Sequence, residues 1–179
     1  MKRIASLILF VLLALGINAQ TYVDISKGWK FIQGDNLEFA KPDYNDSSWK
    51  TIATDKIWEE QGYDPYDGFA WYRIKFVIPS SLKKSSYLKD SLKIFLGKIN
   101  NFDQVYLNGQ MIGENAKNVP IGYKIDTMYL KAPMQMYDVI RRYMIPTSDP
   151  RIQWDKENTL AVRVYDQGGQ GGIYTGNQV

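Results

Sequence analysis

Hydrophobic and polar residues alternate in several short stretches after Thr21, which is the pattern of strands half-buried in an antiparallel sheet. The clearest stretch runs from Ala70 to Pro79, where proline ends the pattern. Alternation puts Tyr72, Ile74, Phe76 and Ile78 on one face and Arg73 and Lys75 on the other. We therefore expect a strand here, with one face in the core and the other in solvent.

Further strands are expected at 91–96, 104–107, 110–113 and 159–165. Asn108-Gly109 separates two of them and predicts a tight hairpin, because both residues tolerate the positive φ angles of a type I′ turn. Helical periodicity is scarce. Residues 134–145 have room for a turn or two of helix, but Arg141–Pro146 resembles a strand that ends at its proline.

Short strands with frequent turn signals predict an all-β sandwich or jelly roll. Aromatic residues make up 14% of the chain, and each buried ring removes a large apolar area from water. The core is expected to contain Trp29, Trp49, Trp71, Phe76, Phe95 and Leu107.

Residues 1–19 have the pattern of a secretory signal peptide: Lys2 and Arg3, then the apolar run Ile4–Leu15, then Ala19. An uncleaved membrane anchor is the alternative, although the run is short for a bilayer. We expect a sandwich domain at 20–179, exported to the periplasm or beyond, with no membrane contact after cleavage. Without Lys2 and Arg3 the charges nearly balance, so nucleic acid is not an expected partner.

The chain contains no cysteine and no histidine. This composition excludes disulfides, thiolate metal sites and a Ser-His-Asp triad. Calcium needs only oxygen ligands and remains possible in principle, but no spaced Asp/Asn loop is evident, so no metal or cofactor is assigned.

Three irregular stretches are candidates for function: 55–69, 114–133 and 166–173. Glu59 and Glu60 are adjacent in the first, but neighbouring strand residues point to opposite faces. A solvated acidic loop is therefore the favoured interpretation over paired catalytic carboxylates.

The 55–69 stretch also brings rings and carboxylates together, as a sugar-binding surface requires. Its candidate binding residues are Trp58, Tyr63, Asp64, Tyr66 and Asp67. The alternative is structural: Trp58 and Phe69 fill the core and Tyr63 forms a lid.

Four groups of residues resemble the sugar-binding domain of family 2 glycoside hydrolases. The first is Asp43–Trp49, and the second is Trp58–Asp64 followed by Gly68–Phe76 with Trp71-Tyr72-Arg73. The third is Gly97-Lys98-Ile99 and Val105–Gly109 with Gly113, and the fourth is Glu157–Val164 with Asp166 and Gly171-Gly172-Ile173. The closest variant is the jelly roll of sialate O-acetylesterase-like proteins, which has the same Arg-Arg-Tyr-x-Ile-Pro strand and glycine-rich loop.

The resemblance implies a galactose-binding-like β-sandwich, with catalysis in a separate domain. It also implies that the loop after the strand at 159–165 leans toward the active site of a neighbouring domain. Asp166 would then accept a hydrogen bond from a sugar hydroxyl, with Gln167, Gln170 and Tyr174 beside it. The alternative is that Asp166 caps backbone N–H groups. In the family a further strand follows Gly-Ile, so the last strand here is expected to be short or missing.

The leading interpretation is an exported, non-catalytic module that binds a glycan or supports a hydrolase domain. One alternative is a fragment of a family 2 glycosidase or sialate O-acetylesterase, with its catalytic part elsewhere. The other is a structural sandwich that contacts proteins through its aromatic loops.

Overall fold

The structure is a computed structural model that describes residues 22–84, 90–115 and 139–174. The predicted signal peptide at 1–19 and residues 116–133 of the second irregular stretch lie outside these ranges.

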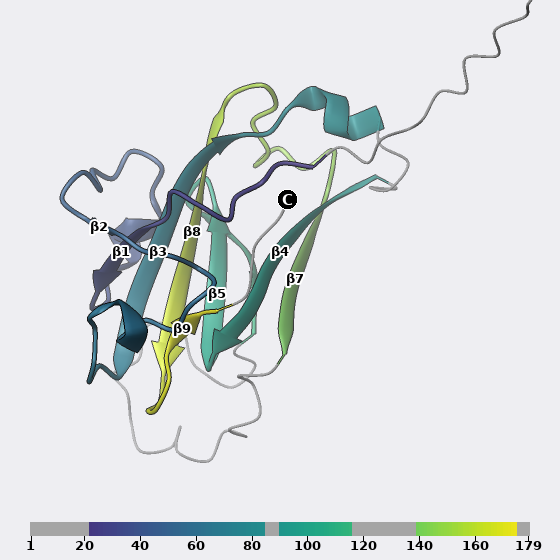
Figure 1. The fold of residues 1–179 in the computed structure, drawn as a ribbon. Helices are drawn as coiled ribbons and strands as arrows, with labels where there is room; N and C mark the ends of the chain where they lie inside the picture. The colour runs from purple at the N-terminus through teal and green to yellow at the C-terminus, as the bar shows by residue number, and fades with distance from the viewer. Residues whose placement is uncertain (1–21, 85–89, 116–138, 175–179) are drawn as a thin grey trace, which may run out of the picture.

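Two antiparallel sheets face each other, so the predicted all-β sandwich is confirmed (Figure 1). The larger sheet has the order β2 (Lys50–Thr51), β1 (Lys30–Gln33), β3 (Gly68–Val77), β8 (Glu157–Asp166), β5 (Phe102–Leu107), β6 (Gln110–Glu114). The smaller sheet has the order β7 (Ile140–Pro146), β4 (Ser91–Asn100), β9 (Gly172–Ile173). β1, β2 and β9 were not predicted; they are too short to show alternation.

In the described ranges, three short 3-10 helices connect the strands: η1 (Leu37–Ala40), η2 (Glu59–Gln61) and η3 (Ser80–Lys84). The described part of region 134–145 is β7, as its proline-terminated pattern predicted. In the hairpin between β5 and β6, Asn108 and Gly109 have φ angles of 50° and 84°, which confirms the predicted turn. Within the described residues, no helix has the length and apolar character needed to cross a bilayer.

The main core lies between the sheets. Tyr72, Ile74 and Ile78 are buried there, as the alternation in β3 predicted. Trp29 and Leu107 are also fully buried. Phe76 and Phe95 are only half-buried, contrary to expectation.

Phe95 is half-buried because Leu92, Ile94 and Leu96 take the inward positions of β4. The Phe95 ring therefore points outward, where the Arg142 guanidinium lies 5.5 Å from its centroid.

A second hydrophobic cluster covers the outer face of the larger sheet. It includes Trp71 from β3, with Phe39 and Trp49 from the segment that crosses above the strand. This packing overturns the expectation that Arg73 faces solvent: Arg73 is 0% exposed. Its guanidinium donates to Asp46 Oδ2 at 2.8 Å and to the carbonyl oxygens of Phe39 and Lys41.

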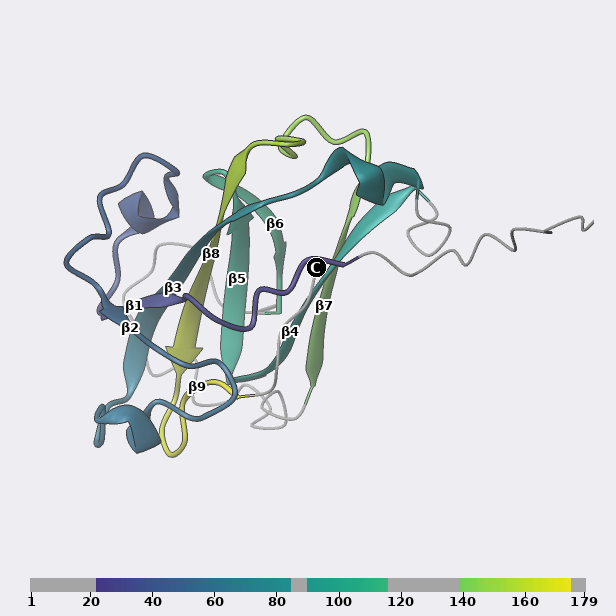
Figure 2. The same ribbon diagram turned by 45° about the horizontal axis from the view of Figure 1, so that its top comes forward.

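One end of the sandwich gathers the segments that matter for function, and we call it the Asp166 end. β8 and β4 finish there, β3 begins there, and β9 and η2 lie beside them (Figure 2). The strand register agrees, because Gly68 pairs with Asp166 and Asn100 pairs with Gly172.

Candidate functional site

Asp166 lies at the last position of β8 and is 1% exposed. Its Oδ1 accepts a hydrogen bond from Gly168 N at 3.2 Å, so the carboxylate does cap the following loop. Its Oδ2 is buried and has no hydrogen-bond partner among the described residues. Burial raises the pKa of Asp166 to about 6, and the nearby carboxylates of Asp67 and Glu59 add to the rise.

Residues 167–171, which we call the glycine loop, cover this carboxylate. Gly168 and Gly169 have φ angles of 136° and 92°, a region of backbone conformation that favours glycine. The Asp67 carboxylate faces Gly168. The loop is thus bordered by two of the predicted acidic residues.

Trp58 and Glu59 hold the far end of the glycine loop. Trp58 N donates to Gly171 O at 3.1 Å, and Gly171 N donates to the Glu59 carboxylate at 3.0 and 3.1 Å. Glu59 belongs to a 3-10 helix rather than a strand, which corrects the expected geometry of the Glu59-Glu60 pair. Sequence reasoning had not given Glu59 this role.

Asn100 and Asn101 hold the near end of the loop, and sequence reasoning missed both. Asn101 Oδ1 accepts a hydrogen bond from Gln167 N at 2.8 Å, and Asn100 Nδ2 donates to Gln170 O. The available signal was two consecutive asparagines between two strands, because asparagine side chains commonly bond to backbone at turns.

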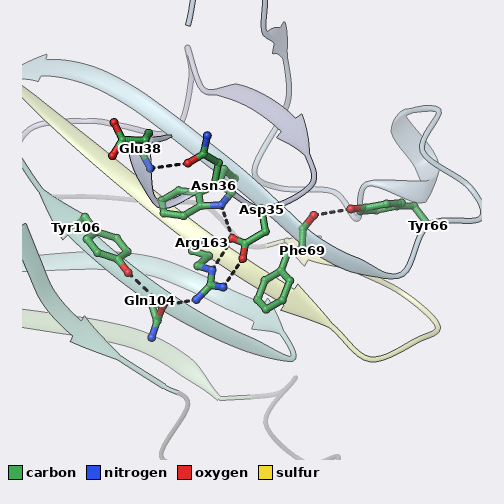
Figure 3. A network of polar contacts seen from close by, with 9 residues as sticks. Asp35, Asn36, Glu38, Tyr66, Phe69, Gln104, Tyr106 and Arg163 are labelled. Carbon is green, nitrogen blue, oxygen red and sulfur yellow. Dashed lines mark hydrogen bonds and ion pairs between the residues drawn. The ribbon is translucent and has the colours of Figure 1, made fainter. Parts of the chain in front are cut away.

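Of the aromatic residues predicted to bind sugar in the 55–69 stretch, Trp58 is buried and Tyr63 and Tyr66 are half-buried. Trp58 is 0% exposed and packs against Phe31, so its structural alternative is confirmed. The ring centroids of Tyr66 and Trp58 lie 5.5 Å apart. The Tyr66 hydroxyl donates a hydrogen bond to Phe69 O (Figure 3). Tyr63 is half-buried against Phe31, with Lys50 Nζ 5.9 Å from its ring centroid.

The remaining predicted residues are spread around the Asp166 end. Asp64, Asp67 and Gln170 are exposed, while Gln167 and Tyr174 are half-buried. Tyr174 forms an antiparallel backbone bridge with Asp55, directly after β9. The structure therefore brings Asp67 to the glycine loop, which contains Gln167 and Gln170 and directly follows Asp166. It places Asp64 and Tyr63 in the η2–β3 connection.

A partly buried network of polar contacts holds β8 just before Asp166 (Figure 3). The Arg163 guanidinium donates to Asp35 Oδ1 at 2.8 Å and to Gln104 Oε1 at 2.9 Å. It also lies 4.2 Å from the centroid of the Phe69 ring. These contacts join β3, β5 and β8 and leave little freedom to the strand that carries Asp166.

A surface pocket of about 420 Å³ lies elsewhere, lined by residues 26–28 and 51–55. None of the predicted binding residues lines it. In the part of the chain that the structure describes, no three His, Cys, Asp or Glu side chains are placed to hold a metal ion. The expectation that the protein has no metal or cofactor stays a prediction.

The raised pKa of Asp166 predicts a pH dependence of stability. Between about pH 4 and 6 the folded protein holds a proton that the unfolded chain has released, so the free energy of unfolding falls as pH rises through that window. Replacing Asp166 with asparagine removes the titration. Urea unfolding from pH 4 to 8 should show Asp166→Asn gaining stability relative to wild type up to about pH 6 and then holding the gain. A pH-independent difference between the two proteins contradicts the burial of this carboxylate.

Comparisons with known proteins point to one group of enzymes. No family model matches the chain. The β-galactosidase BoGH2A of Bacteroides ovatus is 27% identical over 155 residues, which cover 79% of this chain and 15% of the enzyme. The chain thus spans a small part of that relative's length.

Solved structures show the same fold. A Bacteroides uniformis β-glucuronidase has a TM-score of 0.61 at 23% identity, covering 88% of this chain and 17% of the other. A glycosyl hydrolase family 2 member from Bacteroides cellulosilyticus has a TM-score of 0.61 at 18% identity, covering 88% and 20%. At these identities the likeness establishes the fold alone. Together with the sequence relative, it supports a domain related to family 2 β-glycosidases, as the sequence resemblance implied.

Proposed function

We propose that this chain is the exported, non-catalytic sandwich of a family 2-like β-glycosidase, and that its Asp166 end contributes to a sugar pocket. The catalytic groups would come from another domain, in the same polypeptide or in a partner. This is the alternative that sequence analysis left open, and it is favoured because the chain corresponds to only 15% of its relative. The galactose-binding-like jelly roll and the finer likeness to sialate O-acetylesterase-like proteins belong to the same proposal.

One observation carries the assignment of the sugar-binding end. Among the described residues, three buried side-chain atoms have no hydrogen-bond partner: Asp166 Oδ2, Asn100 Oδ1 and Trp58 Nε1. All three residues border the glycine loop. Leaving such a group unpaired costs about 1–3 kcal/mol. A folded protein retains unpaired buried groups mainly where they have a function, such as pairing with a bound ligand.

The chemistry of these atoms suits a sugar. Two accept hydrogen bonds and one donates, and each sugar hydroxyl can do both. Because the three atoms are covered, the glycine loop must shift before a hydroxyl reaches them, and its glycines ease that shift. A carboxylate acceptor also gives the stronger, charge-assisted type of hydrogen bond.

A free-standing glycan-binding module, the leading interpretation from sequence, would use the same atoms. Within the 55–69 stretch, Trp58 is buried and the Tyr66 ring packs on it, so these two rings do not present a free face to a sugar. We therefore expect only weak binding by the chain alone, with a Kd on the order of millimolar. A sandwich that only contacts proteins would show no sugar binding at all.

NMR titration of the ¹⁵N-labelled chain with methyl β-galactoside and methyl β-glucuronide tests the proposal. We expect saturable shifts at the backbone amides of the glycine loop and at the Asn100 side-chain amide. Asp166→Asn should weaken binding by about tenfold, because a neutral amide replaces a charged acceptor. Asp43→Asn is the matched control, because Asp43 is exposed and is not among the predicted binding residues. Flat titrations, or equal loss in both variants, overturn the assignment.

A hydrolysis assay tests the proposal that this chain is non-catalytic. The chain alone should not hydrolyse aryl β-galactosides or β-glucuronides, and turnover by this chain would contradict the proposal. We expect a glycosidase catalytic domain to be encoded either in the same coding sequence as these 179 residues or in a neighbouring gene.

A further inference from the structure

An ion pair crosses the interior between the two sheets. Arg141 Nε on β7 donates to Asp103 Oδ1 on β5 at 2.6 Å, and both residues are 2% exposed. The Tyr143 hydroxyl donates to the other oxygen of the same carboxylate. Burial raises the pKa of Asp103, and the Arg141 charge opposes that rise.

The Arg141 guanidinium also donates hydrogen bonds to three backbone carbonyl groups. Its Nη2 donates to Ile99 O at 2.7 Å and to Asn101 O at 2.8 Å, which are the carbonyl groups before and after Asn100. Its Nη1 donates to Val139 O at 2.6 Å. One planar group therefore fixes the backbone on both sides of Asn100, where the chain passes from the smaller sheet to the larger.

Asn100 and Asn101 connect this part of the backbone to the glycine loop through hydrogen bonds. Asn101 is 5% exposed, and its Oδ1 holds Gln167 N at 2.8 Å. Asn100 holds Gln170 O. Gln167 directly follows Asp166, so the position of this turn decides how the loop covers the carboxylate.

We propose that Arg141 is a positioning residue for the sugar-binding end: it orients Asn100 and Asn101, and through them the glycine loop and Asp166. The proposal rests on the proposed function for its link to sugar. Charge alone does not account for Arg141, because a buried pair is often replaceable by apolar residues without loss of stability. The forked guanidinium reaches a carboxylate and three carbonyl groups at once, which a lysine ammonium cannot do.

The matched control is Arg73. Like Arg141, Arg73 is fully buried, pairs with an aspartate (Asp46) and donates to backbone carbonyl groups. Unlike Arg141, it lies on the outer face of β3, five residues along the strand from Gly68. Arg141→Lys and Arg73→Lys should both lower global stability. Only the first should alter the glycine loop.

Two ligand-free measurements separate these effects. In Arg141→Lys we expect the Gln167 amide to exchange about tenfold faster, beyond what global unfolding explains. The pKa of Asp166 should fall from about 6 toward its ordinary value of 3.8, because water reaches the carboxylate when the loop loosens. Arg73→Lys should leave both readouts as in the wild type. An Arg141→Lys protein with unchanged exchange and unchanged Asp166 titration overturns the proposal.

Asn101→Ala provides the same test if Arg141→Lys does not fold, since it removes only the Gln167 contact and should give the same loop signature. Wild-type behaviour in Asn101→Ala also overturns the proposal. Titration with methyl β-galactoside and methyl β-glucuronide then links loop position to binding, and Arg141→Lys should bind about tenfold more weakly. If the wild type binds neither sugar, the proposed function fails, while the ligand-free results still decide whether Arg141 positions the loop.

Discussion

Replacing Trp58 with alanine is expected to lower the free energy of unfolding by about 3–5 kcal/mol, the usual cost of truncating a buried large aromatic residue. Trp58 is fully buried, packs on Phe31 with ring centroids 5.8 Å apart, and lies directly beneath Gly171. A Cβ placed on Gly171 would lie 2.0 Å from the indole ring, so the two are in close contact. Thermal or urea unfolding of the variant measures the loss.

Trp58→Phe is the matched variant. Phenylalanine keeps most of the buried apolar area and removes the unpartnered indole N–H, so we expect it to lose less than half as much stability as the alanine variant. If Trp58 were instead a sugar platform, the alanine variant would keep wild-type stability and lose only binding. That result would contradict the buried position described here.

Arg73→Ala is expected to cost about 3–5 kcal/mol, because truncation leaves buried polar partners unpaired. The side chain of Arg73 is 0% exposed, and its guanidinium connects Asp46 and the carbonyl oxygens of Phe39 and Lys41 to β3. Without it, the segment above the strand loses its central anchor. We expect faster amide exchange across residues 39–46 as well as a lower unfolding midpoint.

Lys75→Ala is the control on the same face of the same strand. Lys75 is 42% exposed and its Nζ lies 3.3 Å from Glu157 Oε1. A solvated pair of this kind contributes little, so the change should stay within about 0.5 kcal/mol. Equal effects of the two substitutions would place Arg73 in solvent and contradict the second hydrophobic cluster.

The burial of Arg73 and the exposure of Lys75 show what side-chain alternation can and cannot predict. The pattern in β3 correctly assigned Tyr72 and Ile74 to the inner face. It could not distinguish an outer face in water from one covered by a distant segment. Phe39 and Trp49 are far from Arg73 in sequence, and nothing in the residues around Arg73 indicates that they pack above it.

The candidate site divides in the same way. The resemblance identified Asp166 and the glycine loop with its Gln167 and Gln170, and the structure places Asp67 beside them. The supports of the loop were not predicted: Glu59 comes from η2, Asn100 and Asn101 from the junction of β4 and β5, and Arg141 from β7. Their hydrogen bonds exist only when those parts have been brought together.

The amino-acid sequence by itself determined the class of fold, the longer strands and the Asn-Gly hairpin, because side-chain alternation and turn conformation are local properties of the chain. The tertiary structure alone decided which faces are buried, since burial depends on what packs from elsewhere. It moved Trp58 from candidate platform to core and Arg73 from surface to interior. Among the residues that the structure describes, it also left three buried polar atoms unpaired around one loop, which no stretch of sequence could show.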